Sequence, residues 1–295
     1  MIDGTASRPY VTRALVPVLV HGVSAAMPES FRAFVDDHMR GRRIVRLLGW
    51  EDRFSEFAVA TILFAGCFTG FAFAMRRLTL AMYDFPSGFR DLAPLIGLAA
   101  LPLCFRYFSY PYDPATLLLF SLGVLFIIED RVAAFVITLV LAAINKETSV
   151  LLVGLYALNR SISERAGVIV RAALLLLVWC AARGVIEVAY RGRPGGPFET
   201  HVDHTVWLFS TFPGRLWYAL TVVALLAAAV VPGWRDKSLF LRRGLAFTVL
   251  PLFCAALWAG FADELRGYYE ATPFVFLLAL PSIYRWTSDE PSRPA

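Results

Sequence analysis

The chain has 295 residues, of which 58% are hydrophobic and 17% are charged. Globular domains are about 45–50% apolar and about 25% charged, so this composition excludes an ordinary soluble domain and predicts a polytopic helical membrane protein. The net charge of +5 is explained by arginines that flank apolar helices, and it gives no reason to expect nucleic-acid binding. All four cysteines lie inside apolar runs without metal-ligand spacing, so we interpret them as packing residues.

The first 55 residues are mixed in polarity. Between residues 28 and 56, six arginines are balanced by six acidic residues. This pattern predicts a solvated or interfacial outer segment with short amphipathic helices at residues 31–38 and 44–50. We therefore expect an N-terminal segment at 1–55, a transmembrane helical domain at 56–286 and a disordered, Pro-rich tail at 287–295.

Hydropathy predicts an all-α bundle of about nine transmembrane spans. They fall at residues 56–75, 92–108, 114–128, 131–145, 147–160, 167–187, 215–232, 243–260 and 272–286. Several are short, because fifteen residues of helix reach only about 22 Å against a hydrocarbon core of about 30 Å. Such spans require a thinned bilayer or neighbouring helices that shield their ends.

Residues 110–148 form the most informative stretch. Two apolar runs are joined by a short charged turn, and polar clusters stand at their open ends. The clusters are Tyr110-Pro111-Tyr112-Asp113-Pro114 and Asn145-Lys146-Glu147-Thr148. This pattern predicts a helical hairpin whose two polar ends face the same side of the membrane.

The positions of lysine and arginine predict the orientation. With nine spans, the basic loops after the first, fifth and seventh spans share one side, which the positive-inside rule makes cytoplasmic. The opposite side then receives residues 1–55, both polar ends of the hairpin, and the loops at 188–214 and 261–271. We expect a site on this outer face.

Asp113, Lys146 and Glu147 are the strongest candidates within the hairpin. Asp113 precedes a proline and is either a helix N-cap or, beside Tyr110 and Tyr112, a carboxylate that binds substrate or accepts a proton. Lys146 and Glu147 are either a snorkelling lysine and a first-turn acid or functional residues.

Two later loops add further candidates. Arg191 is a candidate phosphate contact. Glu264, Arg266 and Tyr268 form either an exposed charged turn or a phosphate clamp before the last span. His201 and His204 are spaced like metal ligands but lack a third ligand, so we expect no metal.

Together these motifs resemble bacterial GT-C-like integral-membrane glycosyltransferases. The resemblance rests on the two hairpin clusters, on Glu264-x-Arg266-x-Tyr268, and on Arg8-Pro9, Arg13 and Pro17. It implies transfer of a sugar from a polyprenyl-phosphate donor at the outer face of the bacterial cytoplasmic membrane, in cell-envelope synthesis. It also implies a general base after the first span. Asp3 occupies a comparable place, although no span precedes it here.

The predicted site follows from these arguments. Its catalytic candidates are Asp3, Asp113 and Glu147. Its substrate-binding candidates are Tyr110, Tyr112, Asn145, Lys146, Arg191, Glu264, Arg266 and Tyr268. We expect lipid-phosphate-linked sugar and membrane lipids as partners and no nucleotide cofactor, because no nucleotide-binding pattern is present. Two alternatives remain open: a carrier or flippase for lipid-linked saccharides, which would place carboxylates at mid-membrane, and a non-catalytic membrane subunit.

Overall fold

The computed structural model describes residues 4–43, 45, 53–104, 110–159, 165–196 and 198–288. Every regular element within these ranges is a helix, which confirms the all-α prediction. The α-helices are α1 (Leu15–Ala26), α2 (Glu29–Met39), α4 (Phe54–Met82), α5 (Ser87–Ala100), α6 (Asp113–Ile128), α7 (Val132–Asn145), α8 (Leu151–Asn159), α9 (Arg165–Ala189), α10 (Val202–Thr211), α11 (Gly214–Val230), α12 (Leu239–Ala259) and α13 (Thr272–Thr287). The 3-10 helices are η1 (Tyr10–Thr12), η2 (Leu101–Cys104), η3 (Glu147–Val150), η5 (Trp234–Asp236) and η6 (Leu265–Ala271).

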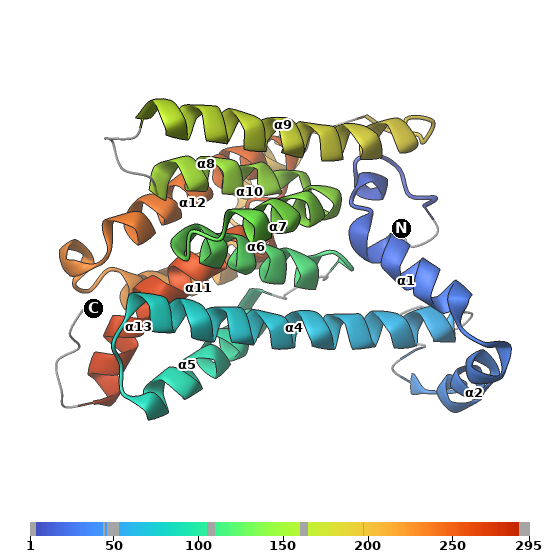
Figure 1. Cartoon of the computed structure of the whole chain (residues 1–295), viewed down its shortest axis with the longest axis horizontal. Helices are drawn as coiled ribbons and strands as arrows, with labels where there is room; N and C mark the ends of the chain where they lie inside the picture. The colour runs from blue at the N-terminus through green and yellow to red at the C-terminus, as the bar shows by residue number, and fades with distance from the viewer. Residues whose placement is uncertain are drawn as a thin grey trace.

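The helix α6 lies at the centre of the bundle. It packs against α4, α7, α8 and α13 (Figure 1), and twelve of its sixteen residues are buried. A helix that is apolar on all sides suits either lipid or a protein interior, and burial shows that α6 occupies the interior. Hydropathy alone does not separate these two environments.

The structure supports three or four membrane-spanning helices among the described residues and does not support about nine. Each predicted span overlaps a helix, but within the described residues only Phe54–Met82, Gly167–Ala189 and Leu239–Ala259 are long and apolar enough to cross a membrane. A fourth candidate joins α10 to α11 across a bend of 85°. The helices α6 and α7 have 16 and 14 residues, which reach only about 24 Å and 21 Å. Their hydrophobicity reflects packing among the longer helices.

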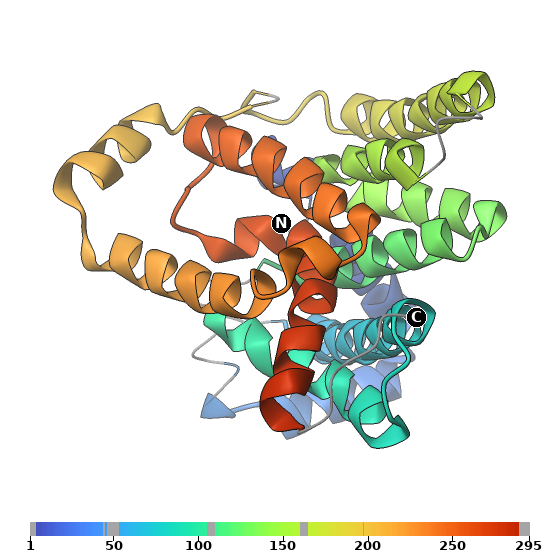
Figure 2. The same cartoon turned by 90° about the vertical axis from the view of Figure 1, so that its left-hand side faces the viewer.

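The α10–α11 pair forms an arm beside the main bundle (Figure 2). Its bend lies at Phe212, whose φ of 43° is left-handed, and at Pro213. Asp263 holds the arm through Arg215 at 3.1 Å and His204 at 3.2 Å. These contacts tie the arm to the loop that leads into α13.

The N-terminal segment is attached to the bundle by its backbone. The Arg8 amide donates to the Pro194 carbonyl at 2.8 Å, and the Ala14 amide donates to the Ile144 carbonyl at 3.1 Å. Residues 8–14 therefore lie over the ends of α7 and α9. The amphipathic helix predicted at 31–38 lies within α2, whereas the one at 44–50 falls, except for Val45, outside the described residues. Most of the predicted tail, residues 289–295, also lies outside them.

The open ends of the α6–α7 hairpin meet, as the hairpin pattern requires. The Asn145 side-chain amide at the end of α7 donates to the Tyr112 carbonyl at the start of α6, at 3.1 Å. At the other end of the hairpin, Glu129 pairs with Arg77 of α4 at 2.6 Å. The two polar corners from the sequence are therefore neighbours.

Candidate functional site

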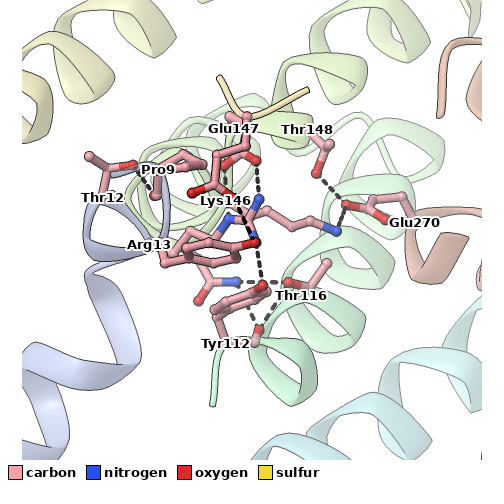
Figure 3. A network of polar contacts seen from close by, with 12 residues as sticks. Pro9, Thr12, Arg13, Tyr112, Thr116, Lys146, Glu147, Thr148 and Glu270 are labelled. Atoms are coloured by element: carbon pink, nitrogen blue, oxygen red, sulfur yellow. Dashed lines mark hydrogen bonds and ion pairs between the residues drawn. The ribbon is translucent and has the colours of Figure 1, made fainter. Parts of the chain in front are cut away.

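A cluster of charged and polar side chains fills the end of the bundle where the hairpin opens (Figure 3). Its members come from the N-terminal segment, the start of α6, the end of α7, η3 and η6. We call it the polar cluster, and it comprises Arg13, Tyr112, Asp113, Thr116, Asn145, Lys146, Glu147, Thr148, Arg266 and Glu270.

Arg13 links Glu147 to Tyr112. Its guanidinium donates to both carboxylate oxygens of Glu147, with Nε 3.2 Å from Oε2, and to the Tyr112 hydroxyl. The same guanidinium lies 4.6 Å from the centre of the Tyr112 ring. Burial alone would raise the pKa of Glu147, but the Arg13 charge and its hydrogen bonds hold that pKa at about 2. Glu147 is therefore ionised at neutral pH, and it is a poor proton acceptor.

Lys146 and Glu270 form a second, more deeply buried ion pair. Lys146 adopts an extended conformation (φ −159°, ψ 140°) between α7 and η3, so its side chain and that of Glu147 diverge. Its Nζ lies 2.8 Å from Glu270 Oε1, which also accepts a hydrogen bond from Thr148. Both charged groups are buried, so each depends on the other for compensation.

Asn145, at the end of α7, lines a small cavity beside the ion pair. Its amide donates to the Thr116 hydroxyl at 2.9 Å in addition to the Tyr112 carbonyl. The cavity has a volume of about 10 Å³ and is also lined by Lys146, Thr148 and Glu270. Asn145 Oδ1 and Glu270 Oε2 make no hydrogen bond within the described structure. This corner thus offers two buried acceptors to a small hydrogen-bond donor.

Asp113 and Arg266 form the third charged pair of the cluster. The Tyr110 amide donates to Asp113 Oδ2 at 2.8 Å, and Arg266 Nη1 lies 3.8 Å from the same oxygen. Arg266 also pairs with Glu264 and lies 4.3 Å from the centre of the Tyr110 ring. Burial raises the pKa of Asp113 and outweighs the opposing effects of Lys146, the Tyr110 amide and Arg266. Of the two described catalytic candidates, Asp113 is the better proton acceptor.

Three tyrosines stack beside these pairs. Tyr10 lies 5.9 Å from Tyr110, and Tyr110 lies 5.3 Å from Tyr112, measured between ring centres. The Tyr10 hydroxyl donates to Glu199 at 3.1 Å. Burial, and secondarily the Glu199 charge, raise the pKa of Tyr10 to about 12. The stack provides an apolar wall with hydroxyls at its edge, next to Arg13 and Arg266.

Arg183 of α9 fixes the segment that carries Arg13. It donates to the Thr12 carbonyl and hydroxyl, each at 3.1 Å, and to the Ala143 carbonyl at 3.3 Å. It also pairs with Glu187 at 2.8 Å, and Glu187 pairs with Arg8 at the same distance. Because Arg183 and Glu187 belong to α9 and Ala143 belongs to α7, these two packed helices set the position of Arg13.

The structure brings most of the predicted residues together and separates others. Tyr110, Tyr112, Asp113, Asn145, Lys146, Glu147, Glu264 and Arg266 gather in or beside the cluster. Arg191 lies exposed on the turn after α9. Tyr268 packs against the hydrophobic core, and burial, with a contribution from Asp263, raises its pKa to about 12. Asp3 lies outside the described residues.

The sequence reasoning missed the roles of Arg13, Arg183 and Glu270. Arg13 binds Glu147 and Arg183 binds Thr12, both more than a hundred residues away, so no local pattern predicts these contacts. Glu270 did carry a signal, because it is an isolated acid at the start of an apolar run, three residues before Pro273. Asp113 also stands at the start of an apolar run, directly before Pro114, and that position made it a candidate.

The two loop histidines are engaged elsewhere. His204 pairs with Asp263 and lies 3.3 Å from the Arg215 guanidinium, and His201 stacks on Phe261. Among the described residues, no three His, Cys, Asp or Glu side chains are grouped to hold a metal ion. A guanidinium beside His204 also disfavours a second cation.

Comparison with protein-family models, characterised proteins and solved structures finds no match for this chain. We therefore infer the chemistry of the polar cluster from its own residues. Arg13, Lys146 and Arg266 bring three cations, each paired with a carboxylate, to one end of a bundle that contains candidate membrane spans. An anionic group that takes the place of one of these carboxylates would meet a cation here, and Asp113 can accept a proton beside it.

Proposed function

We propose that the protein is a GT-C-like membrane enzyme that transfers a sugar from a polyprenyl-phosphate donor to an acceptor. The supporting observation is the convergence of Asp113 and Arg266, within 3.8 Å, at the open end of the hairpin. A lipid-linked donor requires cations for its phosphate, a proton acceptor for the incoming hydroxyl, and access from the membrane. The polar cluster supplies the first two beside apolar helices.

The residues of the cluster have different roles in this proposal. Asp113 removes the proton from the acceptor hydroxyl as its oxygen attacks the anomeric carbon. The bond from that carbon to the lipid phosphate breaks, and the phosphate leaves with the bonding electrons. Arg266 stabilises the leaving phosphate, because its Nε makes no hydrogen bond in the described structure and is free to donate. Arg13 and Glu147 form a positioning pair that holds Tyr112.

Transfer of radiolabelled sugar from a synthetic polyprenyl-phosphate donor, with membranes that contain the full chain, tests this proposal. We expect Asp113→Asn to reduce transfer by at least about a hundredfold, the lower range for loss of a general base, and Arg266→Gln to reduce it by a similar factor through lost stabilisation of the leaving phosphate. Arg191→Gln is the matched control, because Arg191 is exposed outside the cluster, and it should retain activity. Full activity of Asp113→Asn would refute the assignment of the base. Asp3→Asn tests the general base that the family resemblance implies.

A non-catalytic lipid-saccharide-binding subunit is the second candidate. It is favoured by the pairing of both Glu147 oxygens with Arg13 and of Glu270 Oε1 with Lys146 and Thr148, since paired charges of this kind are common in structural networks. If this candidate is correct, both Asp113→Asn and Glu147→Gln retain biological function while binding of the lipid-linked sugar persists. A carrier receives less support, because the buried acids Asp113, Asp263 and Glu270 all lie at or beyond helix ends.

A further inference from the structure

The helix α2 carries an apolar stripe that the bundle covers only in part. With 3.6 residues per turn, Phe31, Phe34, Val35, His38 and Met39 lie within about 140° of its circumference. Val35 is buried, whereas Phe31 and Phe34 are 51% and 55% exposed. Their rings stack on each other at 6.2 Å, and Phe34 lies 4.0 Å from the His38 ring. The exposed side chains thus form one continuous aromatic ridge.

The acids of α2 lie on the opposite side of the helix. Glu29, Asp36 and Asp37 fall within about 50° of the direction opposite the stripe. Arg32, at the border, donates to the carbonyls of Ser24 and Ala25 and thereby caps the end of α1. The aromatic ridge is therefore free of acidic neighbours on its own helix, and α2 is fixed to α1.

Basic residues follow the ridge without an intervening acid. Arg40, Arg42 and Arg43 are all exposed in the turn after α2. The helix also packs against α4, whose Phe54–Met82 segment is a candidate membrane span. In Figure 1, α2 lies at the end of α4 where that helix begins. An aromatic ridge, adjacent arginines and the end of a span coincide in this region.

We propose that α2 lies in the headgroup layer of an anionic membrane. The Phe31 and Phe34 rings enter the acyl boundary, and Arg40, Arg42 and Arg43 contact lipid phosphates. Amphipathic helices of this kind bind through buried apolar area together with attraction to anionic lipid. Charge complementarity and continuity with a spanning helix favour a lipid surface over a second copy of the chain. This inference does not depend on sugar transfer, because the polar cluster contains none of these residues.

Depth-dependent quenching in nanodiscs tests the proposal with the full chain. A fluorescent label is placed at position 31, 34 or 37, each as a cysteine in a background whose four native cysteines are replaced by alanine. A nitroxide attached to the lipid acyl chain close to the headgroup should quench the fluorescence of the labels at 31 and 34 more than that of the label at 37. A water-soluble quencher should show the reverse order. Position 37 is the matched control, because Asp37 is exposed on the acidic face of the same helix.

The lipid composition then tests the arginines. Acyl-chain quenching at 31 should be stronger in discs that contain phosphatidylglycerol than in discs of phosphatidylcholine alone. Replacing Arg40, Arg42 and Arg43 by Gln should lower the ratio of inserted to non-inserted α2 by up to about fivefold per arginine at low salt. Equal water-quencher access at 31 and 37 would overturn the proposal. So would protection at 31 that disappears on dilution in detergent, which would indicate a second copy of the chain.

Discussion

Removal of the Lys146 charge tests the central ion pair of the cluster. Lys146→Met keeps most of the side-chain length but leaves the Glu270 carboxylate with Thr148 as its described hydrogen-bond donor. The side chains of Lys146 and Glu270 are 9% and 1% exposed, so bulk water does not compensate for the lost charge. The variant should therefore be strongly destabilised.

The magnitude follows from the burial of the pair. Breaking a buried ion pair by removing one partner costs about 3–5 kcal/mol, because the remaining charge is uncompensated. This corresponds to a fall of roughly 6–20 °C in the unfolding midpoint on the scale for domains of 150–250 residues. The double variant Lys146→Met with Glu270→Gln removes both charges and keeps an acceptor for Thr148. It should lose at most about 1–2 kcal/mol.

Thermal unfolding in detergent, followed at a single heating rate, is the assay, because membrane-protein unfolding is often irreversible. The matched control is Arg76→Met, which breaks the exposed pair of Arg76 with Asp91 and should cost about 0–1 kcal/mol. If the single Lys146 variant is as stable as the double variant, Glu270 does not depend on Lys146. The charge argument for the cluster would then fail.

Two further predictions concern Arg13 and the packing of α12. Arg13→Gln removes the group that holds the pKa of Glu147 at about 2. Because that pKa is depressed, the pair stabilises the wild type above the ordinary carboxyl range and loses this effect as the pH falls toward 2. The variant should lose about 1–2 kcal/mol at neutral pH after discounting for solvent, and its stability should vary less between pH 5 and 2. Identical pH profiles of the two proteins would contradict this. Gly244→Ala should cost about 1–3 kcal/mol, because its Cβ would lie 2.3 Å from Cε1 of the buried Phe274. In Gly184→Ala the new Cβ would meet no heavy atom of the described structure within 4 Å beyond its chain neighbours and its own helix backbone. This variant should leave thermal stability unchanged or higher, and equal losses in both variants would refute the packing argument.

The arrangement of the α6–α7 hairpin could be predicted from the local sequence pattern. Two apolar runs with polar ends, joined by a short turn, have few arrangements other than adjacent helices, and Asn145 does contact the start of α6. The same apolar runs predicted more membrane spans than the described helices support, because a bilayer and a protein interior favour the same apolar side chains. The lengths of α4, α9 and α12 allow them to span a bilayer, whereas α6 is short and its packed neighbours show that it lies inside the protein.

The ion pairs of the polar cluster could not be predicted from the local sequence pattern. Lys146 and Glu147 were candidates from their position in the turn, but the extended backbone at Lys146 directs them to different partners. Glu147 was a candidate base, and its pairing with Arg13 makes it the weaker proton acceptor of the two described carboxylates. Such assignments depend on which distant cation reaches each acid.

The sequence by itself determined the helical class, the positions of the helices and the polar ends of the central hairpin, because these follow from periodicity and from hydrophobic runs. Only the tertiary structure decided which apolar helices are buried inside the protein and which acid meets which base. The physical reason is that burial and ion pairing depend on contacts between residues far apart in the chain, as between Arg13 and Glu147 or Lys146 and Glu270.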